Sequence, residues 1–177
     1  MWIEAVVKAN PWKRLACLGL VWLLGSLPGP LLAGQGPPPD AQALWKAITA
    51  PPGFQKWGTW SALREQRRSR CATAYGYYAR VFANDIALKA KGSPLPPGSI
   101  VVREGMGMGT NTYAPNGQIH AYTVMYKVPG FNPKGGDWFW ASYSGTGQVR
   151  DAGALSECIK CHQSAWQNDY LLGVELK

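Results

Sequence analysis

The chain contains few residues of the kinds that bind metals, and few charged residues. Its 177 residues include four cysteines and two histidines, and 16% are Asp, Glu, Lys or Arg. A structural zinc site normally takes four ligands, and six cysteines and histidines in total provide few candidates for them. The apolar run at residues 15–27 is shorter than the roughly 20 residues that a transmembrane helix needs. The composition therefore excludes a zinc-rich protein and argues against a membrane span.

The scarce cysteines and histidines are concentrated in residues 158–162, which read Cys-Ile-Lys-Cys-His. This C-x-x-C-H spacing is the attachment motif of a c-type haem. Two thiols at this spacing can add to the two vinyl groups of one haem, and the adjacent histidine can then bind the iron. We therefore predict one haem c, attached through Cys158 and Cys161, with His162 as the proximal iron ligand.

Two other uses of this cysteine pair remain open. A zinc site would need Cys71 and His120 as further ligands, and the neighbours Cys161 and His162 would have to bind the same ion. A redox-active thiol pair is expected within a βαβ unit, and no such pattern precedes this motif. Cys71 itself is expected to be a small buried residue, with an intermolecular disulfide or a reactive thiol as alternatives.

The N-terminus has the layout of a secretory signal peptide. Lys8, Lys13 and Arg14 precede the apolar run, and a short segment ending at Ala33 follows it. We expect a signal peptide over residues 1–33, whose removal also removes Cys17. Because c-type haem is attached outside the bacterial cytoplasm, the leader and the haem motif together predict a periplasmic protein. An uncleaved N-terminal anchor is the alternative.

The remaining sequence has the length of one domain. Residues 34–39 are expected to be a linker, and residues 40–177 a single haem domain. Basic side chains are concentrated in one stretch, at Arg64, Arg67, Arg68 and Arg70. Such a cluster can bind an acidic partner or a nucleic acid. We expect a solvated loop or helix face instead, and an exported haem protein argues against nucleic acid as a partner.

The pattern of apolar and turn-forming residues predicts an α+β fold, with a mainly antiparallel sheet and a few helices. Asp40 is expected to cap a helix that ends before the Pro-Pro-Gly segment at 51–53. Strands are expected at residues 75–84, 99–104, 119–128 and 137–143, with short helices at 85–91 and at the haem motif. Residues 105–118 and 145–153 are expected to be turns. In the third strand, one face should carry Tyr122, Val124, Tyr126 and Val128.

Residues 122–143 read Tyr-Thr-Val-Met-Tyr-Lys-Val-Pro-Gly-Phe-Asn-Pro-Lys-Gly-Gly-Asp-Trp-Phe-Trp-Ala-Ser-Tyr, and the haem motif follows them. Together these segments resemble the cytochrome P-460 family, whose relatives include the cytochromes c′-beta. The resemblance implies an antiparallel sheet packed with helices, and usually a homodimer. It also implies one five-coordinate c-type haem that is ligated by the histidine of the motif.

The same resemblance directs attention to Arg103. The resemblance implies that members which oxidise hydroxylamine share a lysine that is cross-linked to the haem. In this chain the corresponding position is Arg103. A guanidinium stays protonated and is a poor nucleophile, so this cross-link is not expected here. Lys127 or Lys89 would replace it only if the alignment were shifted. Arg103 is expected either as a buried cation paired with a haem propionate or on an exposed strand face.

The opposite side of the iron offers several candidate ligands. Met106 and Met108 are expected to fill a glycine-rich loop, Met125 to be a core residue and His120 to lie on the surface; each is also a candidate sixth ligand. The aromatic residues of the strands are candidates for an apolar ligand pocket, although core packing is the alternative. They are Tyr75, Tyr77, Tyr78, Phe82, Tyr122 and Tyr126.

Three functions are compatible with these features. We favour an exported mono-haem c-type cytochrome with a five-coordinate haem that binds NO, CO or similar small ligands. The second is an oxidoreductase that acts on hydroxylamine or NO. The third is an electron-transfer cytochrome with a methionine or histidine as the sixth ligand and a redox partner protein.

Overall fold

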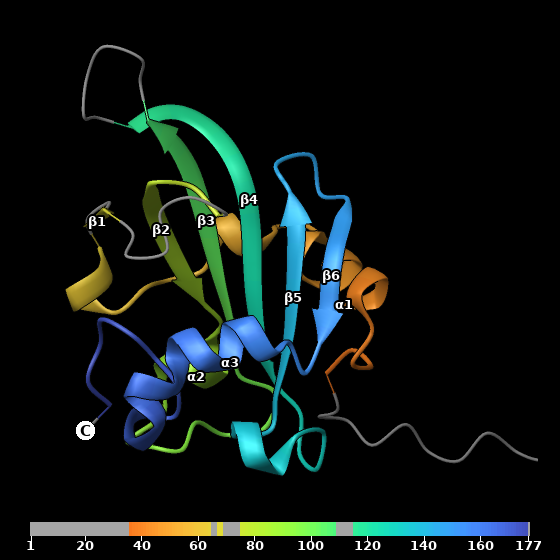
Figure 1. Ribbon diagram of the computed structural model, residues 1–177, viewed down its shortest axis with the longest axis vertical. Helices are drawn as coiled ribbons and strands as arrows, with labels where there is room; N and C mark the ends of the chain where they lie inside the picture. Colours follow the sequence, from red (N-terminus) through yellow and green to blue (C-terminus); the bar gives the residue numbers. More distant parts are fainter. Residues whose placement is uncertain (1–35, 65–66, 69–74, 109–114, 177) are drawn as a thin grey trace, which may run out of the picture. The chain divides into compact units, whose positions relative to one another are not determined.

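Among the described residues, six antiparallel strands form one sheet and are arranged in the order of the sequence. The computed structural model describes residues 36–64, 67–68, 75–108 and 115–176. The strands are β1 (Arg67–Arg68), β2 (Tyr78–Ala83), β3 (Ile100–Met108), β4 (Pro115–Lys127), β5 (Trp138–Ser144) and β6 (Val149–Gly153). Each strand pairs with the next (Figure 1). Sequence-consecutive antiparallel pairing confirms the predicted fold class.

In the described part of the chain, three short α-helices and four 3₁₀ turns accompany the sheet. They are α1 (Ala41–Thr49), α2 (Asp85–Leu88), α3 (Ser156–His162), η1 (Phe54–Lys56), η2 (Ser61–Leu63), η3 (Pro133–Gly135) and η4 (Gln163–Asn168). Asp40 caps α1 as predicted, since its carboxylate accepts a hydrogen bond from the amide of Ala43 at 2.8 Å. Within the described ranges, none of the helices is long and apolar enough to cross a membrane.

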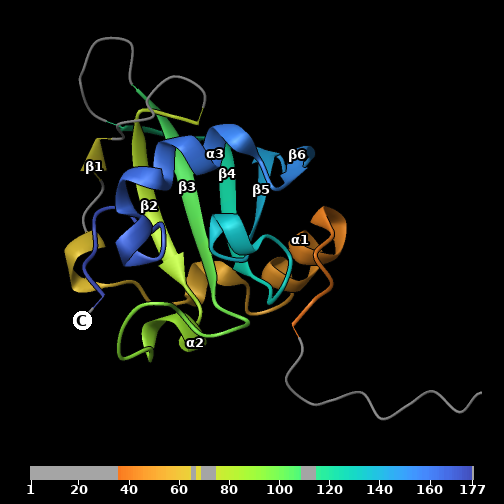
Figure 2. The ribbon, with the colours of Figure 1, turned by 60° about the horizontal axis from the view of Figure 1, so that its bottom comes forward.

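The two faces of the sheet pack against different elements (Figure 2). Strand side chains alternate between the faces, so each face builds its own core. The core on the α1 side contains Leu44, Ile48, Phe54, Val102, Val124, Tyr126 and Tyr143. The core on the α3 side contains Val101, Met125, Trp138 and Trp140, with Leu155, Cys158 and Ile159 packed against them. The α3-side core therefore brings the haem motif onto the sheet.

The alternation predicted for β4 is confirmed, and it also corrects one hypothesis. Tyr122, Tyr126 and Phe82 were candidates for the wall of a ligand pocket, but they pack in the α1-side core. Because the haem motif packs on the other face, these rings lie across the sheet from it. Their alternative role as core residues is the one that the structure supports.

The hairpin between β3 and β4 is longer than predicted. Residues 105–118 were expected to be a turn, but β3 continues through Met108 and β4 begins at Pro115. Irregular pairing interrupts the ladder between Gly105 and Met106. A side chain at Gly105 would collide with the carbonyl of Tyr75, so the glycines here allow close backbone approach within a strand. Met106 is 2% exposed, and the prediction that it fills a loop is therefore wrong.

Two further segments differ from their expected structure. Residues 145–153 were expected to turn throughout, but the turn ends early and β6 pairs with β5 through Trp140 and Gly153. Arg67 and Arg68 were expected in a loop or helix and instead form β1, which pairs with β2. Both strands lie at the edges of the sheet, where pairing with only one neighbour leaves a weak sequence pattern.

Several predictions fall outside the described residues. These are the signal peptide at 1–33, the cysteines Cys17 and Cys71, and Arg70. Part of the predicted linker is described, and it contacts the sheet: the hydroxyl of Tyr126 donates a hydrogen bond to the carbonyl of Pro37 at 2.9 Å. This contact places the start of the described chain against the α1-side core.

Candidate haem site

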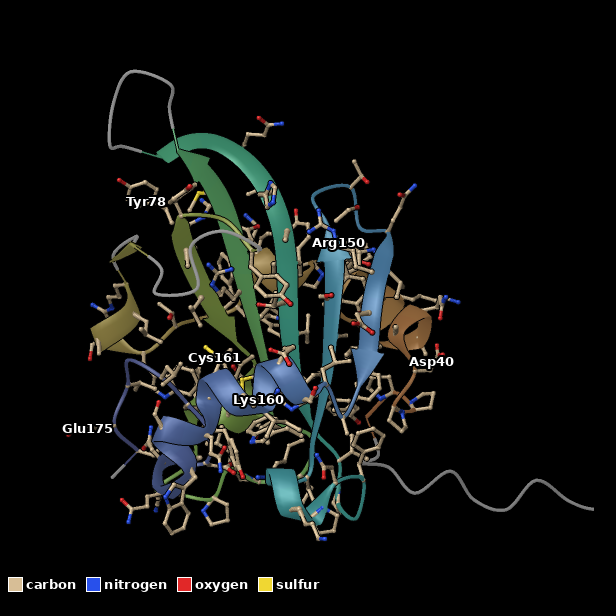
Figure 3. All side chains as sticks on the ribbon, viewed as in Figure 1. Asp40, Tyr78, Arg150, Lys160, Cys161 and Glu175 are labelled. Atoms are coloured by element: carbon tan, nitrogen blue, oxygen red, sulfur yellow. The ribbon has the colours of Figure 1, made fainter. Side chains whose placement is uncertain are left out.

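Helix α3 presents the three predicted haem-binding residues together. Cys161 and His162 follow Cys158 by three and four residues, and side chains at these spacings lie on the same side of an α-helix. Cys158 is partly buried, and Cys161 is exposed. Figure 3 shows Cys161 on α3, next to the sheet. The helical conformation therefore gathers the two thiols and the imidazole as the attachment of one haem requires.

The imidazole of His162 is held by a backbone carbonyl. Its Nδ1 atom lies 2.7 Å from the carbonyl oxygen of Tyr170. Because a carbonyl only accepts hydrogen bonds, Nδ1 carries the proton in the neutral ring and Nε2 keeps its lone pair. Metal-bound histidines commonly donate their other N–H in this way, which fixes the tautomer and the orientation of the ring.

Trp140 provides the wall behind this imidazole. The two rings meet edge to face, with their centroids 4.8 Å apart. Trp140 belongs to β5 and is nearly completely buried, so the packing of the sheet restricts how the imidazole can turn. The Nε1 atom of Trp140 is also buried and has no hydrogen-bond partner among the described residues.

The surroundings of His162 lower its pKa and so favour the neutral ring. Burial lowers the pKa of His162 below its ordinary value, the hydrogen bond to Tyr170 opposes that shift, and the positive charge of Arg103 reinforces it. Desolvation and a nearby cation both disfavour an imidazolium. A neutral imidazole is the form that binds a metal, so the electrostatics favour the protonation state that iron ligation requires.

Arg103 lies on the same face of the sheet as the haem motif. Its guanidinium donates hydrogen bonds to the carbonyl of Tyr75 at 2.7 Å and to the carbonyl of Gly76 at 3.1 Å. The residue is partly buried, between the buried cation and the exposed strand residue that were the two expectations. Arg103 is a cation close enough to influence His162, while its pairing with a haem propionate stays a prediction.

The two lysines considered as substitutes differ in environment. Lys127 is buried, and its ammonium lies 2.6 Å from a carboxylate oxygen of Asp169. Lys89 is exposed and pairs with Asp85 on α2. Both ammonium groups are engaged by a carboxylate, and breaking the buried pair would leave Asp169 without its counter-ion. Neither environment therefore favours a covalent bond from these lysines.

The candidate sixth ligands differ in burial. His120 is exposed on β4, as predicted. Met125 is buried and belongs to the α3-side core, which confirms the prediction of a core residue. Met108 belongs to β3, but its side chain lies outside the described part of the structure. Met125 and the haem motif thus belong to the same core, and sulfur ligation stays a prediction.

The donor set fits a c-type haem better than the alternatives. A helix carries both thiols, and a neutral imidazole has its Nδ1 proton engaged and its Nε2 lone pair available. The adjacent α3-side core supplies aromatic and aliphatic side chains that suit a flat, largely apolar macrocycle. In the described part of the chain, no group of three or more Cys, His, Asp or Glu side chains could hold a metal ion.

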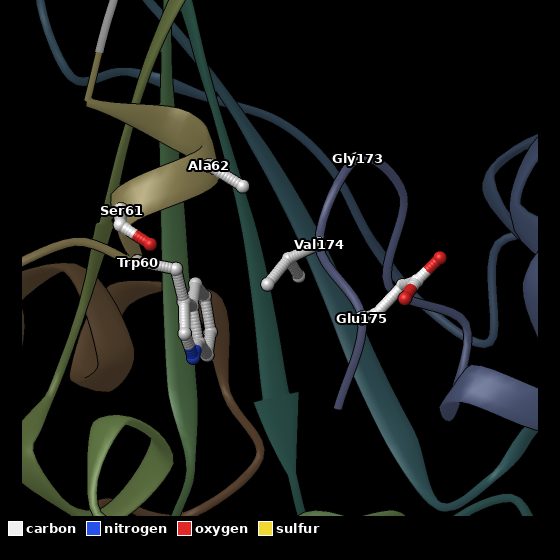
Figure 4. A pocket seen from close by; sticks show the side chains of 6 residues that line it. All are labelled: Trp60, Ser61, Ala62, Gly173, Val174 and Glu175. Atoms are coloured by element: carbon white, nitrogen blue, oxygen red, sulfur yellow. The ribbon is translucent and has the colours of Figure 1, made fainter. Parts of the chain in front are cut away.

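A surface cavity of about 530 Å³ lies elsewhere on the α3-side core. It is lined by Trp60, Ser61 and Ala62 on one side and by Gly173, Val174 and Glu175 on the other (Figure 4). None of the haem-motif residues contributes to its lining. The cavity therefore lies outside the site that we describe.

Sequence reasoning missed two residues of this site, Tyr170 and Trp140. Tyr170 acts through its carbonyl, and a backbone acceptor leaves no signature in the identity of the residue. Trp140 lies in the Gly-Asp-Trp-Phe-Trp segment at 136–140 on which the family resemblance partly rests, but its role beside His162 depends on how β5 packs under α3.

Comparison with known proteins shows the family to which the chain belongs. The model of the cytochrome P-460 family matches residues 51–172. A search of curated proteins found no match. The family match covers most of the chain and includes the complete haem motif and the strands beneath it. The protein therefore belongs to the cytochrome P-460 family, and this membership implies a c-type haem as its cofactor.

Proposed function

We propose that this chain is an exported mono-haem c-type cytochrome that binds NO or a similar small neutral ligand. The haem is attached through Cys158 and Cys161, His162 binds one side of its iron, and the other side stays open. The bound haem supplies an iron with a vacant coordination position for a diatomic ligand. The protein supplies the attachment, the axial imidazole and an apolar surface.

The hydrogen bond from His162 Nδ1 to the carbonyl of Tyr170 carries this proposal. It leaves Nε2 as the only ring nitrogen that can bind iron, on a helix that also carries both thiols. A redox-thiol reading of the motif gives no reason for this arrangement, and a zinc site would need further ligands, of which the described residues offer no group. The lowered pKa of His162 supports the same conclusion, since the ligating ring must be neutral.

The residue at position 103 supports ligand binding over hydroxylamine oxidation. Its guanidinium is engaged with the carbonyls of Tyr75 and Gly76, and arginine remains protonated under ordinary conditions. The cross-link of the hydroxylamine-oxidising members is therefore not expected. An exposed His120 gives no support to a histidine as the sixth ligand.

Optical spectroscopy of the mature chain, expressed in a host that matures c-type haem, tests this function. We expect a ferrous high-spin haem whose spectrum shifts on addition of CO and of NO, with an ordinary c-type pyridine haemochrome. A six-coordinate low-spin spectrum that CO does not change would overturn the proposal and favour electron transfer. An abnormal haemochrome would instead indicate a further covalent bond and favour hydroxylamine or NO oxidation.

The place of the protein in the cell is part of the same proposal. Haem attachment to a C-x-x-C-H motif and a leader over residues 1–33 both require export, so we place the mature protein in the periplasm. Fractionation of cells that express the full chain should recover haem-stained protein from the periplasm. Size-exclusion chromatography with light scattering would test the homodimer that the family resemblance implies.

A further inference from the structure

Asp169 is a buried carboxylate that the proposed function does not use. It is 4% exposed, and both of its oxygens have partners: one accepts from the ammonium of Lys127 at 2.6 Å, and the other accepts from the amide of Leu95 at 2.8 Å. Its backbone carbonyl accepts from the indole of Trp138 at 2.9 Å. Asp169 is thus fixed by three separate parts of the chain.

Lys127 is held as firmly on the other side of the ion pair. Its side chain is 9% exposed, and its ammonium lies 4.7 Å from the centroid of the Trp138 ring. Lys127 and Trp138 are direct partners in the β4–β5 ladder. The cation is therefore anchored at the end of the β4–β5 ladder, and the only described carboxylate that it pairs with belongs to the C-terminal segment.

The ion pair adjoins the residue that orients His162. Asp169 and Tyr170 both have positive φ values, 52° and 64°, a conformation that costs non-glycine residues free energy and persists only where surrounding contacts hold it. The turn that these residues form directs the Tyr170 carbonyl back to Nδ1 of His162. The side-chain contacts of Asp169 tie this turn to Lys127 and Leu95, and the hydroxyl of Tyr170 adds a bond to the carbonyl of Lys134 at 3.1 Å.

We propose that Lys127 and Asp169 are positioning residues, which hold the Tyr170 carbonyl against His162 and so set the electron donation from the imidazole to the haem iron. This inference rests on the proposed role of His162 as the iron ligand. A carbonyl that accepts the Nδ1 proton makes the imidazole a more basic ligand. A more basic axial ligand stabilises the ferric state, so loosening the turn raises the reduction potential.

Resonance Raman spectroscopy and redox titration of the haem-loaded variant Asp169→Asn test the proposal. We expect the iron–histidine stretching frequency of the ferrous protein to fall. We also expect the equilibrium constant for reduction to rise at least threefold, which corresponds to about 28 mV at 59 mV per tenfold change for one electron. An unchanged stretching frequency would overturn the proposal, whatever the potential does, because charge removal alone also raises a potential.

The double variant Lys127→Met, Asp169→Asn separates positioning from charge. It removes one positive and one negative charge, so the net charge near the haem does not change. Replacing both members of a buried pair is tolerated far better than removing one, which makes this variant the safeguard if Asp169→Asn does not fold. A lowered stretching frequency in the double variant supports positioning, and a wild-type frequency overturns it.

Glu104→Gln provides the matched control. Glu104 is also a buried carboxylate paired with a basic side chain, since Arg80 contacts it at 2.6 Å. Glu104 follows Arg103 directly in β3. Its side chain therefore points to the opposite face of the sheet, toward the α1-side core. We expect this variant to lose stability and to keep the wild-type stretching frequency. A frequency lowered equally in the control would show a general effect of destabilisation and would overturn the proposal.

The wild-type spectrum distinguishes failure of this inference from failure of the proposed function. If the wild-type protein shows no iron–histidine band, or keeps the band in His162→Ala, the assignment of the iron ligand is wrong. If the band is present and depends on His162 but is insensitive to Asp169, only the positioning role is wrong.

Discussion

The indole of Trp140 packs edge to face against the imidazole of His162, with 4.8 Å between the ring centroids. One ring comes from the middle of β5 and the other from the end of α3. The contact joins the haem motif to the most buried strand of the sheet. A residue that supports the fold thereby also limits the orientation of the candidate iron ligand.

This contact predicts that Trp140→Ala destabilises the protein strongly. Deleting a buried tryptophan side chain should lower the free energy of unfolding by about 3–5 kcal/mol, because a cavity replaces the ring. Guanidinium unfolding followed by far-UV circular dichroism measures the change. Trp166→Ala is the control, since Trp166 is 62% exposed and its removal should change stability by no more than about 0.5 kcal/mol. Equal losses in both variants would contradict the assigned packing.

The attachment of haem predicts the behaviour of the cysteine variants. Replacing both Cys158 and Cys161 by alanine should abolish covalent haem, because no thioether bond can form. Intact-protein mass spectrometry and haem staining after denaturing electrophoresis measure this loss. Cys71→Ala, outside the motif, should keep its haem. Covalent haem in the double variant would show that the attachment is assigned to the wrong residues.

The hydrogen bonds of Arg103 predict a structural cost for its removal. Arg103→Ala leaves the carbonyls of Tyr75 and Gly76 without these donors, and hydrogen bonds to charged groups contribute about 1.5–3 kcal/mol each. We expect the free energy of unfolding to fall by about 2 kcal/mol or more. Arg103→Lys should keep only part of this free energy, because an ammonium lacks the planar fork of a guanidinium.

Arg150→Ala is the matched control for Arg103→Ala in the same unfolding measurement. Arg150 also donates to a backbone carbonyl, that of His120 at 3.1 Å, but this contact is exposed. Its removal should change the free energy of unfolding by no more than about 0.5 kcal/mol. If Arg150→Ala lowered the free energy of unfolding as much as Arg103→Ala, burial of the hydrogen bond would not explain its contribution to stability.

Tyr143 predicts a pH dependence of stability on the alkaline side. Its hydroxyl donates to the carbonyl of Ala41 at 2.8 Å, and burial raises its pKa well above the ordinary value. As the pH rises past about 10, the phenol ionises first in the unfolded chain. The unfolded state then binds fewer protons, so the free energy of unfolding decreases with increasing pH.

The variant Tyr143→Phe tests this dependence. At neutral pH we expect a loss of about 1 kcal/mol from the missing hydrogen bond. Above pH 10 the variant should lose stability less steeply than the wild type, by up to about 1.4 kcal/mol per pH unit. Urea unfolding at several pH values measures both effects. Parallel pH profiles would show that Tyr143 does not hold its proton in the folded state.

Local patterns predicted much of the fold. The Asp40 cap and the Pro-Pro-Gly stop delimit α1, and the alternation from Tyr122 to Val128 assigns the faces of β4. These predictions succeed because each depends on residues that are neighbours in the same element. β6 and the extended ends of β3 and β4 were missed, because glycines and polar residues in them hide the period of two that a strand normally shows.

For the candidate site, the sequence by itself determined the three haem-motif residues and the family. A fixed spacing along one helix is enough to bring two thiols and an imidazole together. Only the tertiary structure decided what surrounds them: the carbonyl of Tyr170, the ring of Trp140 and the pair formed by Lys127 and Asp169, which are 42 residues apart. Such contacts arise from the packing of strands and turns against each other, and no local periodicity encodes them.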